Sequence, residues 1–166
     1  MRPIDADEFR ARYRGIARSW DHLELRDMYG TEREIAPFAQ WAAGEPVDPA
    51  GLDWWCGIVR ELAGAGRALR RVKVVSEPVS RYHRWVHSTQ QHIVAAGEPT
   101  RWCPRRLLSG LPLPGNDFYL LDDATRDVPA LQRRRGGNRL CRVGGPRGGR
   151  PLPYRVRRLL APRDPA

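Results

Sequence analysis

The sequence predicts a small α/β domain followed by a basic tail. Apolar residues recur at helical spacing in four stretches of the first 125 residues, and runs rich in β-branched or aromatic residues stand between them. Charge divides the chain at the same place: residues 1–125 carry 17 basic and 17 acidic side chains, whereas residues 126–166 carry 12 arginines and two aspartates. We therefore expect an electrically balanced domain over residues 1–125 and a tail over residues 126–166.

The first part of the domain is expected to hold two helices and a strand. Phe9, Tyr13 and Ile16 stand at helical spacing, and residues 20–25 are suited to a short strand at the edge of a sheet. Residues 31–34, Thr-Glu-Arg-Glu, have the form of a capping box and predict the start of a second helix.

The pentapeptide Ala-Ala-Gly-Glu-Pro occurs twice, at residues 42–46 and 95–99. In each copy the glycine can take the left-handed conformation that ends a helix, and the proline prevents the helix from continuing. The flanking residues do not match, so we interpret the two copies as two helix ends and not as a repeat.

The middle of the chain is typical of a strand–helix–strand unit. A third helix is expected over residues 54–62, a central strand over 69–75 and a long helix over 82–93. Residues 100–103 and 117–121 are extended pieces. The order strand, helix, strand implies a right-handed crossover and a parallel pair.

Several segments resemble an actinobacterial family known only as a domain of unknown function, over a range from about Phe9 to Asp123. They are Leu-Arg-Arg-Val-Lys-Val-Val-Ser-Glu-Pro-Val-Ser-Arg-Tyr-His-Arg-Trp at residues 69–85, Ala-Gly-Glu at 96–98, Arg-Trp at 101–102 and Leu-Pro-Gly-Asn-Asp-Phe at 113–118. Members of that family often lie beside genes for helix-turn-helix regulators, so the resemblance implies a regulatory partnership. More distantly, the element order resembles degenerate phospholipase-D-like domains that bind and do not cleave.

The tail departs from that family, whose members usually continue with two strands and a closing helix. Here arginine, glycine and proline make up 24 of the last 41 residues. Such a segment buries too little apolar area to offset its ordering entropy, so we expect it to be disordered and the sheet to lack its usual last strands and helix.

Two explanations for the tail stay open. A cationic arm would neutralise nucleic-acid phosphates through Arg133, Arg134, Arg135, Arg155, Arg157 and Arg158. Alternatively, the tail is a frameshift product, because codons for arginine, glycine, proline and alanine accumulate when a GC-rich gene is translated out of frame. A displaced frame of permitted codons can restore an ending that resembles the family's.

The sequence shows no recognised catalytic motif and no metal or cofactor motif. His83 and His87 are four residues apart, but no acid completes a His-Glu-x-x-His pattern, so we expect solvated histidines and no metal site. Phospholipase-D chemistry needs a His-x-Lys motif, and the single lysine, Lys73, stands between valines. No P-loop or Gly-x-Gly-x-x-Gly motif is present, so we expect no cofactor and no catalysis.

Ligands of open α/β sheets bind beyond the carboxyl ends of the strands. Glu77 follows the central strand and Arg105 follows the next one, so we expect the two side chains to face one cleft. The full set of candidate ligand-binding residues is Glu77, Tyr82, Arg84, Arg101, Arg105, Asp117 and Asp122. The alternative is that these residues form ion pairs and caps around a structural core, with Asp122 as a turn residue.

Three functional hypotheses follow. The first is a non-catalytic accessory of a helix-turn-helix regulator, the second is a nucleic-acid-binding protein that uses its tail, and the third is an enzyme of unrecognised type. No stretch approaches the roughly 20 apolar residues of a membrane-spanning helix. The first residues are too acidic for a signal peptide, so we expect a cytoplasmic protein without a membrane partner. The oligomeric state stays open.

Overall fold

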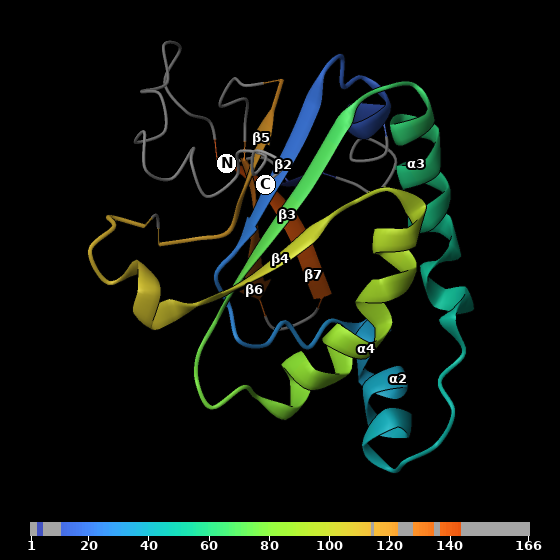
Figure 1. The fold of residues 1–166 in the computed structure, drawn as a ribbon, viewed down its shortest axis with the longest axis vertical. Helices are drawn as coiled ribbons and strands as arrows, with labels where there is room; N and C mark the ends of the chain where they lie inside the picture. The colour runs from blue at the N-terminus through green and yellow to red at the C-terminus, as the bar shows by residue number, and fades with distance from the viewer. Residues whose placement is uncertain (1–2, 5–10, 114, 123–127, 135–136, 144–166) are drawn as a thin grey trace, which may run out of the picture.

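The computed structural model describes residues 3–4, 11–113, 115–122, 128–134 and 137–143 (Figure 1). The main sheet has the strand order β4-β3-β2-β5. Its strands are β2 (Ser19–Glu24), β3 (Ala68–Val75), β4 (Thr100–Pro104) and β5 (Phe118–Leu121). The α-helices are α2 (Glu32–Ala42), α3 (Asp53–Gly64) and α4 (Arg81–Ala96), and the short 3-10 helices are η1 (Pro49–Leu52) and η2 (Arg105–Leu108). The α/β class predicted from the sequence is confirmed.

Strands β2, β3 and β4 are parallel to one another, and β5 runs antiparallel to β2. The predicted parallel pair around a crossover helix is confirmed by β3, α4 and β4, and β3 is an inner strand as expected. The prediction that β2 lies at the edge is wrong, because β5 pairs along its outer side and all six of its residues are buried.

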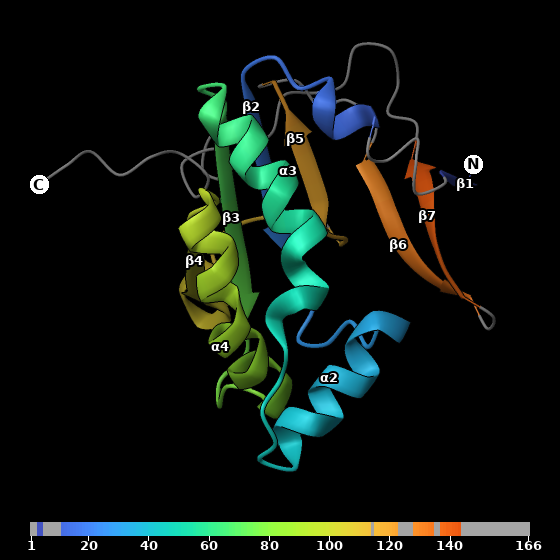
Figure 2. The same cartoon turned by 90° about the vertical axis from the view of Figure 1, so that its right-hand side faces the viewer.

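The two faces of the main sheet pack against different parts of the chain. Helices α3 and α4 cover one face (Figure 2), where Trp20 and Leu69 join a core with Trp55, Val59 and Ile93. Residues one position further along each strand point the other way, because side chains alternate along a strand. That second face carries a separate core, consisting of Leu23, Val72, Val74, Leu108, Phe118 and Leu120.

The helix ends follow the chemistry predicted from the sequence. The Thr31–Glu34 capping box is present at the start of α2. Gly44 follows the end of α2 with a φ of 79°, and Gly97 ends α4 with a φ of 116°. The interpretation of the two pentapeptides as helix ends is therefore confirmed.

A second, antiparallel sheet consists of β1 (Pro3–Ile4), β7 (Gly137–Val143) and β6 (Val128–Arg134), in that order. Strands β6 and β7 lie in the segment expected to be disordered and without strands, so the structure differs from that expectation here. Antiparallel pairing is made by backbone hydrogen bonds at alternate residue pairs and does not itself need a hydrophobic side-chain pattern. Residues 144–166 lie outside the described residues.

In the part of the chain that the structure describes, no helix is both long and apolar enough to cross a membrane.

Candidate functional site

The carboxyl ends of β2, β3 and β4 meet at one edge of the sheet, because these three strands are parallel. Three segments leave this edge: residues 25–31 after β2, residues 76–80 after β3, and η2 after β4. The side chains of Asp27, Ser76 and Arg105 come together there. We refer to these three residues, with His83 of α4, as the edge cluster.

Asp27 is the centre of the edge cluster. The Ser76 backbone N–H donates to Asp27 Oδ1 at 2.9 Å, and the Ser76 hydroxyl donates to Oδ2 at 2.6 Å. Arg105 donates from Nε to Ser76 Oγ at 3.1 Å, and its Nη2 lies 3.7 Å from Asp27 Oδ2. Asp27 and Arg105 each keep 41% of their side-chain surface exposed, so solutes can reach both.

Electrostatics keep Asp27 ionised. Burial by itself raises the pKa of Asp27, but the two hydrogen bonds from Ser76 and the charge of Arg105 lower the pKa more, so the net shift is downward. The carboxylate is therefore the normal state of this group at neutral pH.

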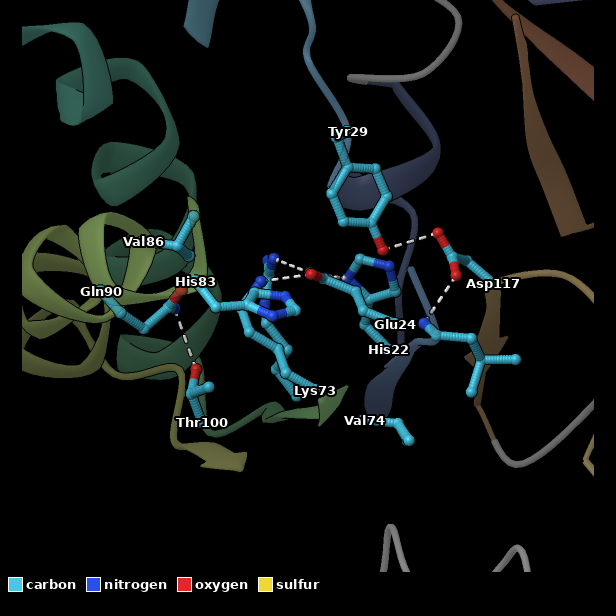
Figure 3. Close-up of polar contacts among 12 residues, drawn as sticks. His22, Glu24, Tyr29, Lys73, Val74, His83, Val86, Gln90, Thr100 and Asp117 are labelled. Carbon is cyan, nitrogen blue, oxygen red and sulfur yellow. Dashed lines mark hydrogen bonds and ion pairs between the residues drawn. The ribbon is translucent and has the colours of Figure 1, made fainter. Parts of the chain in front are cut away.

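Leu25 connects the edge cluster with Asp117. Arg105 donates to the Leu25 carbonyl, and the Leu25 N–H donates to Asp117 Oδ1 at 2.7 Å. The Tyr29 hydroxyl donates to Asp117 Oδ2 at 2.7 Å (Figure 3). Burial raises the pKa of Asp117 although both of these hydrogen bonds oppose the shift. Arg105 and Asp117, two of the predicted site residues, thus hold the two backbone polar groups of one loop residue.

His83 lies in the first turn of α4 and is buried, with 2% of its side chain exposed. Its Nδ1 lies 3.7 Å from Asp27 Oδ1 and has no hydrogen-bond partner among the described residues. Burial and the charge of Lys73 lower the pKa of His83, against the opposing effects of Asp27, Glu24 and a hydrogen bond to the Arg26 backbone. The expectation of solvated histidines is wrong for His83, because α4 begins underneath the loop after β2. It is confirmed for His87, which is exposed.

A chain of buried charges lies under the edge cluster, on the face of the sheet that α3 and α4 cover. Lys73 pairs with Glu24, and Glu24 also pairs with Arg71. Arg71 then binds both carboxylate oxygens of Glu98, at 2.9 and 3.1 Å. Figure 3 shows Glu24 between Lys73 and His22. The four ionised groups alternate in sign, so the net charge of this group of side chains is zero.

The neighbours in this buried chain stabilise one another's charges. Burial raises the pKa of Glu24, but Lys73 and Arg71 outweigh it and hold the pKa well below its usual range. Burial lowers the pKa of Arg71, but Glu98 and Glu24 raise it above its ordinary value. For Lys73 burial prevails, and its pKa is lowered. The sequence interpretation missed these residues, because the partners come from different strands and only the sheet pairing brings them together.

Other predicted residues lie apart from the edge cluster. Glu77 is at the same edge, but its carboxylate accepts from Arg106 Nε at 2.6 Å on the surface. Tyr82 is buried and donates to Glu34 Oε1 at 2.7 Å. Glu77 and Arg105 thus lie at the same edge of the sheet, but Glu77 pairs with Arg106 and not with the edge cluster.

Three further candidates lie elsewhere in the fold. Arg84 is exposed on α4. Arg101 stands opposite Val72 in the sheet, on the face away from Lys73. Asp122 follows β5 at the other end of the sheet, has a φ of 53°, and accepts from the N–H groups of residues 17–19. This placement agrees with the turn interpretation of Asp122.

Only two of the six arginines predicted to contact nucleic acid belong to the residues that the structure describes. Arg133 and Arg134 belong to β6, of which the structure describes the backbone alone. Arg135, Arg155, Arg157 and Arg158 lie outside the described residues. Within the described ranges, the histidine, cysteine and acidic side chains form no group of three or more that could hold a metal ion.

Residues 7–132 match the model of a family described as a domain of unknown function, DUF6879. The chain belongs to the DUF6879 family. No curated protein and no solved structure matches it. The expected resemblance to a domain of unknown function is thus confirmed, and the match extends beyond Asp123 into β6. All four residues of the edge cluster lie inside the DUF6879 match, whereas Arg133 and the later arginines lie outside it.

Proposed function

We propose that this chain is a non-catalytic, ligand-responsive accessory of a helix-turn-helix transcription regulator, and that its ligand binds at the edge cluster. One observation carries the proposal: segments that follow three parallel strands converge on Asp27, whose carboxylate is 41% exposed. This edge is where open α/β sheets bind ligands. The resemblance to a family often encoded beside such regulators supports the partnership.

The loop that carries Asp27 also supports a response to a ligand. Residues 25–31 lead directly into α2, and none of the residues of α2 is buried. Helix α2 contacts α4 through the ring of Phe38, 5.8 Å from Tyr82 and 5.4 Å from Trp85, and through the hydrogen bond from Tyr82 to Glu34. A ligand that moves Asp27 therefore acts on an element without a buried residue, which is the kind of element that changes position at low cost.

The buried charges support a binding role over catalysis. Lys73 is the residue type that would serve as the phosphate-binding cation in phospholipase-D-like chemistry, and it is paired with Glu24 under α4. A phosphate-binding cation has to reach the substrate. Lys73 is 5% exposed, so substrate access to it is poor.

The test is a binding measurement with the regulator encoded beside the gene. The purified full chain is added to that regulator and its labelled operator DNA, and fluorescence anisotropy is followed. We expect the chain to bind the regulator and to change its operator affinity. DNA binding by the chain alone, weakening steeply with salt, would favour the cationic arm instead. Absence of any effect on the regulator would contradict the proposal.

A further inference from the structure

We propose that Ser76, Arg105 and His83 form a binding site for an oxyanion, the phosphate or carboxylate group of a small ligand, and that Asp27 occupies this site as a built-in substitute. The proposal names the ligand class for the edge cluster and in that respect rests on the proposed function.

The donors around Asp27 are arranged as they would be around a bound oxyanion. Ser76 offers its backbone N–H and its hydroxyl to two different oxygens of one carboxylate, at 2.9 and 2.6 Å. Arg105 adds a positive charge 3.7 Å from the same group. Backbone N–H groups, hydroxyls and a guanidinium are the donors that proteins use for phosphate and carboxylate ligands.

His83 supplies an independent indication of a ligand. Its side chain is almost fully buried, yet Nδ1 has no hydrogen-bond partner among the described residues, and Asp27 Oδ1 at 3.7 Å is too far away to provide one. Buried polar atoms nearly always have a partner. An oxyanion with three or four oxygens is larger than a carboxylate, so it can contact Ser76 and Arg105 and also accept a hydrogen bond from His83 in the tautomer that carries its proton on Nδ1.

The surroundings allow an exchange between Asp27 and an external anion. Asp27 lies in a loop outside helix and strand, and its side chain is 41% exposed. Two other carboxylates of this edge, Glu24 and Glu77, are paired with Lys73 and Arg106 respectively. The charges of these two carboxylates are balanced, so they oppose a second anion less than lone carboxylates would.

The experiment removes the Asp27 carboxylate by mutation and adds acetate or phosphate to the solution. Thermal unfolding of the wild-type chain and of Asp27→Ala is measured in chloride, acetate and phosphate at equal ionic strength. In chloride, we expect Asp27→Ala to unfold at a lower temperature than wild type. When acetate or phosphate is present at several times its Kd, we expect the melting temperature of Asp27→Ala to rise by about 2–4 °C more than that of wild type. Phosphate stabilises folded proteins in general, so the difference from wild type is the quantity that counts.

Adjacent arginines give a matched control. In the Asp27→Ala background, Arg105→Gln should abolish the extra gain, whereas Arg106→Gln should keep it, because Arg106 pairs with Glu77 at the surface. A gain in phosphate but not in acetate would assign the site to phosphate groups, and a gain in acetate alone would assign it to carboxylates. An equal gain in wild type and Asp27→Ala would overturn the proposal, as would identical behaviour of the two arginine variants.

A second measurement covers the case in which Asp27→Ala does not fold. The Asp27→Asn variant keeps the shape of the side chain and removes its charge. Titration with phosphate should shift the Ser76 amide resonance in Asp27→Asn at lower concentrations than in wild type. An unmoved Ser76 amide in both proteins would overturn the oxyanion site while leaving the regulator partnership intact. Conversely, anion binding without any effect on the regulator would contradict the proposed function alone.

Discussion

Arg71 connects two buried carboxylates, Glu24 at the carboxyl end of β2 and Glu98 just before β4. It pairs with Glu24 on one side and binds Glu98 through two hydrogen bonds on the other. Glu98 also accepts a hydrogen bond from Trp55 Nε1 at 3.1 Å, so the network of buried charges is linked to α3. Buried charges cost several kcal/mol each in desolvation unless they are paired. The sheet therefore depends on this network for the orientation of β2 and β3.

We predict that Arg71→Met destabilises the fold more than Lys73→Met. Arg71→Met removes a cation from Glu24 and from Glu98, whereas Lys73→Met leaves Glu24 beside Arg71. Loss of one partner from a buried pair costs about 3–5 kcal/mol, so we expect Arg71→Met at the upper end of that range or beyond it. Urea unfolding of both variants provides the comparison. If Lys73→Met lost more free energy of unfolding than Arg71→Met, Arg71 would not be the main partner of Glu24 and Glu98.

We also predict that acid weakens the fold through His22. Burial lowers the pKa of His22 well below its ordinary value of 6.5. Below pH 6.5, His22 binds a proton in the unfolded chain but stays neutral in the folded chain. The contribution of His22 to the free energy of unfolding is therefore complete above pH 6.5 and is lost as the pH falls below it. His22 stacks on Tyr119 with ring centroids 4.1 Å apart, and phenylalanine preserves that stacking.

The measurement is urea unfolding of wild type and His22→Phe between pH 5 and pH 7.5. We expect the wild-type free energy of unfolding to decline more steeply than that of the variant as the pH falls below 6.5. Some decline should remain in His22→Phe, because burial also lowers the pKa of His83. Equal slopes for the two proteins would show that His22 takes no part in the acid sensitivity.

At the scale of elements, the repeated pentapeptide ends α2 and α4 in different surroundings. Gly44 has a φ of 79° and open space around it, whereas a Cβ on Gly97 would lie 2.7 Å from the Cβ of Ala63. We predict that Gly44→Ala costs about 1 kcal/mol, which is the strain of a left-handed residue. Gly97→Ala should cost clearly more, because overpacking adds about 1–3 kcal/mol. Chemical denaturation measures both costs, and equal values would mean that α3 yields to the added methyl group.

Most elements were predictable because their periodicity or their end signals are local. The capping box at Thr31 and the glycines after α2 and α4 act within a few residues of the chain. The position of β2 was not predictable, because Asp21, His22 and Glu24 are typical of an exposed edge. Arg70 pairs with Asp21 and Lys73 with Glu24, each across 49 residues of sequence. No local pattern indicates that such distant charges neutralise one another.

The part of the candidate site that was predictable is the part that follows from the order of the strands. Arg105 and Asp117 were found because polar residues at strand ends face the ligand edge of an open sheet. Asp27 and Ser76 were missed, since a single aspartate in a loop and a serine before Glu77 carry no motif. His83 was assigned to solvent because helical spacing gives its neighbours on α4 but not the loop that covers it.

At the scale of the whole molecule, the sequence places an excess of arginine in residues 126–166, whereas residues 1–125 are balanced in charge. The edge cluster and the buried charges belong to residues within the DUF6879 match. The arginines of the proposed cationic arm lie beyond it. The proposed accessory function therefore assigns the activity to the edge of the main sheet, and the alternative proposal assigns it to the tail.

The most direct test of the central claim uses two neighbouring arginines. Operator affinity of the helix-turn-helix regulator proposed as the partner is measured with the wild-type chain, with Arg105→Gln and with Arg106→Gln. Arg105 contacts Ser76 and the Leu25 carbonyl, whereas Arg106 is 69% exposed and pairs with Glu77. We predict that Arg105→Gln loses the effect on operator affinity and that Arg106→Gln retains it. Equal activity of the two variants would contradict the assignment of function to this edge of the sheet.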